Sequence, residues 1–223
     1  MKIAIIIPIL NEAENLHDLA ANLHALSPPA DEVIIIDGGS TDMSVSIAQY
    51  FGFKVTQSAS GRAQQMNQGA SISTADTFLF LHADTRLPSN ALSKIRQVNP
   101  PFWGRFDVQI DRPRFIFRLI SFMMNLRSRI TGIATGDQAI FISRQLFEKI
   151  GGYPDQPLME DIELSKQLKS DHPPLCLKNR VMTSARRWEK YGVWRTIWLM
   201  WRLRFLYWRG VPTHKLIGEY HYD

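Results

Sequence analysis

Acidic side chains follow the apolar segments of the sequence at several points, and one has a histidine two positions before it. Asp37 follows VIII, Asp84 follows FLFLHA, and Glu160 with Asp161 opens EDIELSKQL. An open α/β sheet keeps its ligands at the carboxyl ends of its strands, so these carboxylates could meet at one edge. A carboxylate near the imidazole of His82 suits Mg²⁺ or Mn²⁺, completed by phosphate oxygens. Taken singly, each Asp could also be a turn or cap residue.

The N-terminal half of the sequence alternates apolar runs with helical patterns. The runs Ile3–Ile9, Val33–Ile36 and Phe78–Leu81 predict strands, and helices are expected near 12–26, 41–51, 61–72 and 89–97. This alternation is typical of an α/β fold whose parallel sheet is covered by helices. Ser40 or Thr41 is expected to cap the second of these helices.

The pattern changes from Trp103 onward. WGRFDVQI alternates like a half-exposed strand, and an apolar, basic helix is predicted to follow it to about Arg129. A strand over QAIFIS and a helix beginning near Met159 come next. Because there is no repeat and no linker rich in Gly or Ser, we interpret residues 1–223 as one domain, divided near residue 100.

Composition limits the location and the partners of the chain. Its 223 residues are 45% hydrophobic, enough for a substantial core, and the single Cys176 has no partner for an internal disulfide. No apolar run approaches the roughly 18 residues of a membrane span, and no cleavage pattern follows the first apolar run. We therefore expect a cytoplasmic protein. The net charge of +5 favours an anionic partner.

The segment 192–210 combines aromatic residues with arginines. Its large apolar side chains fall on one helical stripe, namely Trp194, Ile197, Trp198, Trp201, Phe205 and Trp208. This composition predicts an amphipathic helix that lies on the inner face of a membrane. The alternatives are packing against its own domain or a dimer interface, which would make the protein a homo-oligomer. No nucleic-acid-binding motif accompanies the charge, so no nucleic acid partner is expected.

Six segments resemble, in order, the motifs of family 2 glycosyltransferases. They are IIIPILNEAENL, VIIIDGGSTDMS, GRAQQMNQGA, FLFLHADT, GDQAIFISRQLFEKIGGYP and MEDIELSKQL, and they span about residues 3–170. The resemblance implies a GT-A fold, with a Rossmann-like, mostly parallel central sheet flanked by helices. It also implies that about 1–100 bind the nucleotide sugar and about 101–185 the acceptor. About 186–223 would be a basic aromatic C-terminal helix and tail.

The resemblance implies roles for residues around the nucleotide. The family's Pro-x-x-Asn-Glu segment lines the nucleotide pocket, which here points to Pro8, Asn11 and Glu12. Asp37 is expected to contact the base or ribose, a use of carboxylates that is also seen in dinucleotide folds. Capping of the following turn is the alternative for Asp37.

The segments GRAQQMNQGA and HAD would hold the diphosphate and its metal. Arg62 would neutralise phosphate and Asn67 would hydrogen-bond the nucleotide, with a solvated helix face as the alternative for both. HAD stands in the place of the family's Asp-x-Asp motif, which makes Asp84 the implied ligand of Mn²⁺ or Mg²⁺. His82 departs from that motif, and its imidazole could bind Mn²⁺, ribose or phosphate.

The remaining implied site residues lie in the C-terminal half. Asp161 matches the family's general base, which takes the proton of the acceptor hydroxyl, and Glu160 is the alternative. Asp137, in TGDQA, falls among the donor-sugar and acceptor contacts. SARRWEKYG resembles the Arg-Trp part of the Gln-x-x-Arg-Trp motif, with Arg187 and Trp188 in place and without its Gln.

These observations predict an inverting, metal-assisted transfer of a sugar from a nucleotide diphosphate donor, a UDP-sugar, to an acceptor for which a lipid or isoprenoid-type molecule is one candidate. The alternative is a non-catalytic sugar-nucleotide-binding or membrane-associated partner protein, in which His82 marks lost catalysis. A nucleotidyltransferase would carry a Gly-rich loop with Arg after the first strand, and a Rossmann oxidoreductase would carry Gly-x-Gly-x-x-Gly there. The sequence has neither.

Overall fold

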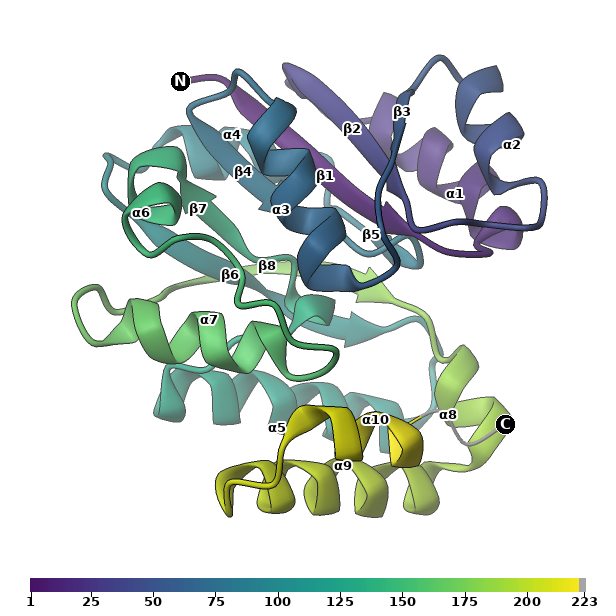
Figure 1. The fold of residues 1–223 in the computed structure, drawn as a ribbon, viewed down its shortest axis with the longest axis vertical. Coiled ribbons are helices and arrows are strands. Elements are labelled where there is room, and N and C mark those ends of the chain that lie inside the picture. Colours follow the sequence, from purple (N-terminus) through teal and green to yellow (C-terminus); the bar gives the residue numbers. More distant parts are fainter. Residues whose placement is uncertain (221–223) are drawn as a thin grey trace.

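The computed structural model describes residues 1–220 and contains an eight-stranded sheet with helices on both faces (Figure 1). The strand order is β3-β2-β1-β4-β7-β6-β8-β5. The strands are β1 (Ile3–Ile9), β2 (Glu32–Asp37), β3 (Lys54–Gln57), β4 (Thr77–Phe80), β5 (Thr85–Arg86), β6 (Trp103–Ile110), β7 (Phe141–Ser143) and β8 (Leu175–Thr183). One sheet therefore contains strands from both predicted halves, and the predicted α/β class is confirmed.

The strands β1 to β4 form the parallel part of the sheet. β2 pairs with β1 and β3, and β4 pairs with β1, all in parallel. Alternate residues of β1 enter different apolar clusters, Ile5 and Ile7 on one face and Ala4 and Ile6 on the other. This is why β1 reads as a continuous apolar run, because both of its faces are covered.

Helices from both halves of the chain cover the two faces. They are α1 (Ala13–His24), α2 (Ser44–Tyr50), α3 (Arg62–Ile72), α4 (Ala91–Arg96), α5 (Phe115–Thr131), α6 (Arg144–Lys149) and α7 (Glu160–Lys169), with a 3₁₀ turn η1 (Gly136–Gln138) before β7. Helices α1, α2 and α4 pack in the first cluster, and α3, α6 and α7 in the second. The predicted cap of α2 is wrong, because the helix begins at Ser44 and Asp42 binds the N–H of Ser44 (2.9 Å).

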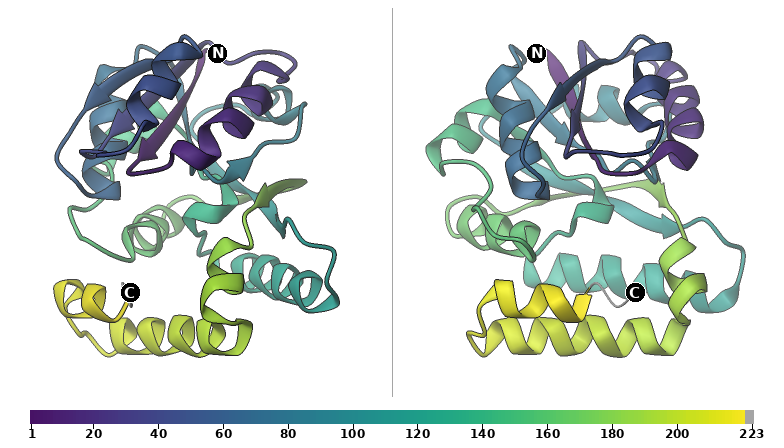
Figure 2. Two further views of the ribbon diagram at one scale, coloured as in Figure 1. Left: turned by 90° about the vertical axis from the view of Figure 1, so that its right-hand side faces the viewer. Right: turned by 45° about the vertical axis from the view of Figure 1, so that its right-hand side comes forward.

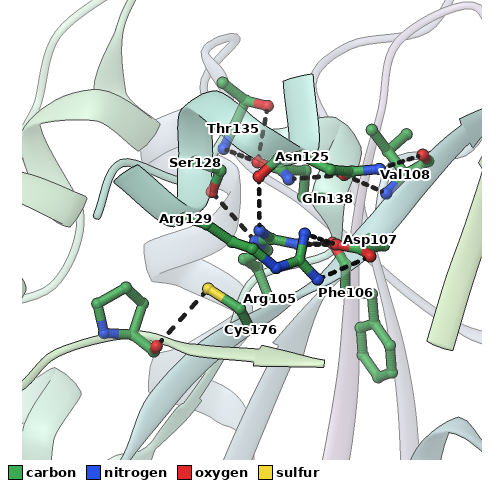
Figure 3. A network of polar contacts seen from close by, with 11 residues as sticks. Arg105, Phe106, Asp107, Val108, Asn125, Ser128, Arg129, Thr135, Gln138 and Cys176 are labelled. Atoms are coloured by element: carbon green, nitrogen blue, oxygen red, sulfur yellow. Dashed lines mark hydrogen bonds and ion pairs between the residues drawn. The ribbon is translucent and has the colours of Figure 1, made fainter. Parts of the chain in front are cut away.

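The strand β6 is more buried than its alternating sequence predicted. Arg105 is fully buried, because its guanidinium forms an ion pair with Asp107 and donates to Ser128 Oγ (3.1 Å) of α5. Figure 3 shows that this network continues through Asn125, which accepts from the backbone N–H of Val108 (2.9 Å). Polar residues in a strand can be buried when another element supplies their hydrogen-bond partners, and α5 supplies such partners here.

The C-terminal segment is divided into α8 (Arg186–Tyr191), α9 (Val193–Trp208) and α10 (Thr213–Tyr220). Gly192 and Gly210, each with φ 82°, separate these helices, because glycine adopts this left-handed conformation readily. Figures 1 and 2 show α9 and α10 at the end of the molecule away from the strands β1 to β4, while α5 packs against β6. The part of the predicted tail at 221–223 lies outside the described residues. Within 1–220, no helix is long and apolar enough to cross a bilayer.

Candidate active site

The carboxyl ends of β1, β2 and β4 lie at one edge of the sheet and bring several predicted motifs together. Ile9 at the end of β1 pairs with Asp37 at the end of β2. β4 runs parallel to β1 and ends at Phe80, two residues before His82. The segment HAD therefore leaves the sheet beside the loops that follow β1 and β2, the edge at which α/β sheets bind ligands.

The loops after β1 and β2 hold each other in place. The backbone N–H of Asn11 donates to Ser40 Oγ (2.9 Å), and that of Thr41 donates to Asn11 Oδ1 (2.8 Å). Asn11 has φ 54°, a conformation that Asn adopts more readily than most residues. The N–H of Glu12 donates to Ser44 Oγ (2.8 Å) at the start of α2. Asn11 remains exposed and Glu12 half-buried at this rim.

Two of the predicted nucleotide contacts are buried. Asp37 lies inside the turn, and its carboxylate accepts from the N–H groups of Gly39 (3.2 Å) and Ser40 (3.1 Å). This is the capping role that the sequence left open beside a nucleotide contact. Pro8 is buried within β1, where it pairs with Ile36. Both positions shape the loops, and their contact with a nucleotide stays a prediction.

Gln65 joins the ends of β1 and β2, and sequence reasoning missed it. Its buried Nε2 donates to the carbonyl oxygens of Ile9 (2.9 Å) and Ile36 (2.8 Å). A Cβ at Gly38 would lie 3.1 Å from the Gln65 side chain, so the turn after β2 packs directly on this amide. A polar residue on the same helical face as buried residues such as Met66 and Gly69 was the signal that could have identified it.

Asn67 supports the wall of the site. Its Nδ2 donates to the carbonyl of Tyr153 (2.8 Å), and its Oδ1 accepts from the N–H of Tyr153 (2.9 Å). Both the nitrogen and the oxygen of this amide bind backbone, and the predicted hydrogen bond from Asn67 to a nucleotide stays a prediction. The phenol that this pairing positions is buried near Glu160 and Asp161. Burial, and then these two carboxylates, raise the pKa of Tyr153.

His82 meets the 3₁₀ turn that carries Asp137. His82 Nδ1 lies 3.4 Å from Asp137 Oδ1, and a Cβ at Gly136 would collide with the imidazole ring. Burial alone would raise the pKa of Asp137, but the hydrogen bond and charge of His82, with Arg62 and Arg204, hold that pKa below its ordinary value. HAD and TGDQA, distant in sequence, therefore form one unit.

The acidic pair opens α7 next to that turn. Asp161 Oδ2 accepts from the N–H of Gly136 (2.9 Å), and its Oδ1 accepts from the N–H of Ile162 (2.7 Å). Met159 has φ 65°, and such left-handed non-glycine residues are concentrated at functional sites. Glu160 is buried. Burial and the adjacent Asp161 raise the pKa of Glu160, and the opposing influence of Arg62 is smaller.

Arg62 and Arg187 meet the last described residue, Tyr220 of α10. Arg62 opens α3. Desolvation by its surroundings alone would lower the pKa of Arg62, but Tyr220, Glu160 and Asp137 hold it above its ordinary value. The Arg187 guanidinium lies 3.8 Å from the centroid of the Tyr220 ring and donates to the Tyr220 carbonyl (3.0 Å). Arg62, the predicted phosphate ligand, and Arg187 thus both lie beside Tyr220.

Trp188, which follows Arg187 in the Arg-Trp part of the Gln-x-x-Arg-Trp motif, lies away from Tyr220. It packs against an apolar cluster formed by Ile110, Phe117, Ile120 and Ala185. Its place in this cluster positions α8 and so the neighbouring Arg187. A direct contact of Trp188 with substrate stays a prediction.

Asp84 lies apart from the other carboxylates of the site. It lines a polar cavity of about 360 Å³ together with Asp18, Asp111 and Arg112, and its only hydrogen bond within residues 1–220 comes from Thr85 Oγ1 (3.3 Å). No group of three or more His, Cys, Asp and Glu side chains within 1–220 could hold a metal ion by itself. A single carboxylate oxygen ligand fits Mg²⁺ or Mn²⁺ only if water and donor phosphates complete the shell, which is how Mg²⁺ is commonly bound.

Comparisons with known proteins agree with this geometry. The computed fold superposes on the mannosyltransferase PcManGT from Pyrobaculum calidifontis in complex with GDP-Man and Mn²⁺, with a TM-score of 0.66 and 19% identity, covering 92% of this chain and 61% of that one. Residues 1–349 of TarS from S. aureus, in complex with UDP-GlcNAc, give a TM-score of 0.63 and 16% identity, covering 82% of this chain and 58% of that one. These likenesses show a GT-A fold.

A sequence relative and a family model complete the comparison. The uncharacterized glycosyltransferase YibD of Escherichia coli (strain K12) is 32% identical over 89 residues, which are 37% of this chain and 26% of that protein. The match thus spans about a quarter of the relative's length. The model of glycosyl transferase family 2 matches residues 4–143, more than half of the chain. The chain therefore belongs to glycosyl transferase family 2.

Proposed function

We propose that this chain transfers a sugar from a nucleotide diphosphate donor, a UDP-sugar, to an acceptor with inversion at the anomeric carbon. The observation that carries the proposal is the convergence of Arg62, His82, Asp137 and Asp161 at the carboxyl edge of the parallel strands. The solved structures with UDP-GlcNAc and with GDP-Man support a nucleotide-sugar donor for a chain of this fold.

In this proposal Asp161 is the general base. Two backbone N–H groups orient its carboxylate and leave lone pairs on each oxygen for the acceptor proton. As the acceptor oxygen loses its proton to Asp161, it bonds to the anomeric carbon while the bond from that carbon to the diphosphate breaks. Glu160 is the weaker candidate, because burial and Asp161 favour its protonated form.

The donor diphosphate would lie between arginines and the metal-binding carboxylate. Arg62 and Arg187 can supply cationic donors once Tyr220 moves from them. Asp84 would hold Mn²⁺ or Mg²⁺, which would stabilise the negative charge of the departing nucleoside diphosphate. The structure of glucosyl-3-phosphoglycerate synthase (GpgS) from Mycobacterium tuberculosis in complex with Mn²⁺ and UDP supports such a metal in this fold. His82, held by Asp137, would contact ribose or phosphate.

The protein is further proposed to work in the cytoplasm on the inner face of a membrane. The aromatic stripe of α9 points to solvent, with exposed fractions of 75% for Trp194, 60% for Trp198, 71% for Trp201 and 77% for Trp208. Its opposite face, with Thr196 and Leu203, is buried. α5 adds exposed Phe115, Phe122 and Ile130. Exposed arginines on both helices, such as Arg118 of α5 and Arg202 of α9, make an anionic lipid surface the fitting partner.

A non-catalytic sugar-nucleotide-binding protein is the second candidate. It is favoured by His82, which stands where the family motif has an acidic residue and faces Asp137 instead of an open ligand position. Such a protein would bind the donor without releasing the sugar.

Thermal unfolding with and without ligands tests the proposal. The purified chain is measured with UDP, GDP and dTDP sugars, each with and without Mn²⁺, and donor hydrolysis is assayed in parallel. A ligand at about 100 times its Kd adds about 2.7 kcal/mol to stability. We expect a UDP-sugar to stabilise the protein only with metal, and Asp84→Asn to abolish that stabilisation. Asp18→Asn, in the same cavity, is the matched control.

The outcomes separate the candidates. Stabilisation without hydrolysis would support the non-catalytic protein. No stabilisation by any nucleotide sugar would overturn both.

A further inference from the structure

Two half-buried arginines from different helices, Arg127 and Arg204, lie within electrostatic reach of Asp161. Arg127 belongs to α5 and shares a helical face with Ile120 and Met124, seven and three residues before it. Arg204 belongs to α9, seven residues after Ile197 on the same face of that helix. Ile120, Met124 and Ile197 pack in one cluster. The two arginines therefore come from helices that pack on one cluster, and Figure 1 shows both helices at the lower end of the molecule.

Within residues 1–220, neither guanidinium group has a hydrogen-bond or ion-pair partner. Nε and Nη2 of Arg127 are buried and make no hydrogen bond in this described part of the chain. Arg204 forms no ion pair within residues 1–220, where other arginines of the chain do. A buried donor without an acceptor is destabilising, so the position of Arg127 is unfavourable in the free protein.

The local electrostatics agree with that assessment. Burial lowers the pKa of Arg127 to about 10, and the neighbouring Arg204 lowers it too, while Asp161 and Asp137 act in the opposite direction. Burial also lowers the pKa of Arg204, again against Asp161 and Asp137. The arginines thus repel each other and lie near the acidic residues without pairing with them. An anion between the two guanidinium groups would remove both penalties.

We propose that Arg127 and Arg204 bind a phosphate monoester group of the acceptor, and this inference rests on the proposed function. A phosphate monoester carries a charge of about −1.5 to −2 and three terminal oxygens. It therefore fits two guanidinium groups better than a carboxylate ligand would, because a carboxylate has a single charge and two oxygens. The pair lies next to Asp161, the proposed base. It is distinct from Arg62 and Arg187, which meet Tyr220. The phosphate anchors the acceptor so that its nucleophilic hydroxyl reaches Asp161.

The source of the phosphate is either a lipid or a soluble molecule. The same two helices carry the exposed apolar side chains, so a phosphate presented at an apolar surface would reach this pair directly. The chemistry of the site is shared by both sources, and separate arms of the experiment distinguish them.

The first experiment measures thermal unfolding in saturating UDP and Mg²⁺, so that the donor arginines are occupied, while phenyl phosphate is titrated at constant ionic strength. We expect it to stabilise the wild type, and Arg127→Met and Arg204→Met to weaken its binding by roughly tenfold or more. Without phosphate, Arg127→Met should unfold at the same temperature as the wild type or above it, because it removes buried donors that have no acceptor within residues 1–220. Arg118→Gln, exposed on α5, is the matched control and should keep the wild-type response.

Two results would overturn the proposal. One is a wild type that responds to UDP but not to phenyl phosphate, which leaves the donor proposal intact. The other is destabilisation of Arg127→Met together with an unchanged phosphate response, which would assign the arginine a structural role. If UDP does not change the unfolding temperature, the donor proposal fails separately. The phenyl phosphate titration is then repeated without UDP.

A second arm compares phenyl phosphate with vesicles of phosphatidylcholine containing phosphatidic acid. Loss of vesicle binding in Arg127→Met and Arg204→Met, with a weak response to phenyl phosphate, supports a lipid phosphate. A strong response of the wild type to phenyl phosphate that both variants lose supports a soluble acceptor. The proposed phosphate site is contradicted if both variants bind vesicles and respond to phenyl phosphate as the wild type does.

Discussion

The Nδ1 atom of His82 lies 3.4 Å from Oδ1 of Asp137, across a turn whose Gly136 leaves no room for a Cβ beside the imidazole. The two residues come from loops that are distant in sequence, and the N–H of Gly136 also binds Asp161 (2.9 Å). One short turn therefore couples the HAD segment to the proposed base. A change in the turn should affect both.

Gly136→Ala tests this coupling. The added Cβ would collide with the His82 ring, and overpacking of this kind costs about 1–3 kcal/mol. We expect a lower Tm together with weaker UDP-sugar binding, both measured by thermal unfolding. Gly218→Ala has open space around the added Cβ and serves as the control. Normal donor binding in Gly136→Ala would show that the turn and the donor site are independent.

Asn67→Ala distinguishes a positioning residue from a nucleotide ligand. It removes both hydrogen bonds to the backbone of Tyr153, so the free protein should lose roughly 1–3 kcal/mol of stability. The stabilisation by UDP should remain close to that of the wild type. The reverse pattern, an unchanged Tm without ligand and a lost UDP response, would restore the nucleotide contact that the sequence predicted.

Asp161→Asn should reduce catalysis without removing donor binding. The amide keeps an oxygen that accepts a backbone N–H but cannot take a proton from the acceptor, so donor hydrolysis should fall by about 10²–10⁴. The UDP-induced shift in Tm reports binding in the same sample. Activity near the wild-type rate would exclude Asp161 as the base and leave Glu160 to be tested.

The stability of Glu160→Gln should depend on pH. Burial and Asp161 raise the pKa of Glu160 above 4.5, so the folded protein binds this proton more tightly than the unfolded chain. Ionisation therefore destabilises the folded state as pH rises from 4.5 through the higher folded value. The variant should unfold at a higher temperature than the wild type at about pH 8, and the difference should disappear toward about pH 4. A pH-independent difference would contradict the raised pKa.

The double variant Trp198→Ala and Trp201→Ala tests the membrane surface of α9. We expect the wild type to bind phosphatidylglycerol vesicles. The affinity of the variant should be lower by roughly tenfold or more, because two exposed aromatic side chains are lost. Phosphatidylcholine vesicles should bind less. Tyr50→Ala, 82% exposed on α2, is the control and should bind like the wild type. A wild type that ignores vesicles but forms a dimer, which the variant loses, would identify the stripe as a protein interface.

Much of the fold was predictable because its signals are local. The apolar runs Ile3–Ile9 and Phe78–Leu81 read as buried strands since helices cover both faces, and the helix 62–72 was predicted within a residue. The order of the acidic motifs predicted the edge at which His82 and Asp161 contact the same turn. These features depend on residues that are neighbours in the chain or on the topology of a parallel sheet.

Long-range partners decided the rest. Arg105 is buried because α5 supplies Ser128 and Asn125, and WGRFDVQI alone contains no sign of that helix. Asn67 pairs with the backbone of Tyr153, 86 residues away. The meeting of Arg127 with Arg204 arises only when α5 and α9 pack together. The sequence by itself determined the strands, the helices and the family motifs through local periodicity and residue type. Only the tertiary structure decided which polar side chains are used within the protein and which remain for a ligand, because hydrogen-bond partners are set by contacts between distant segments.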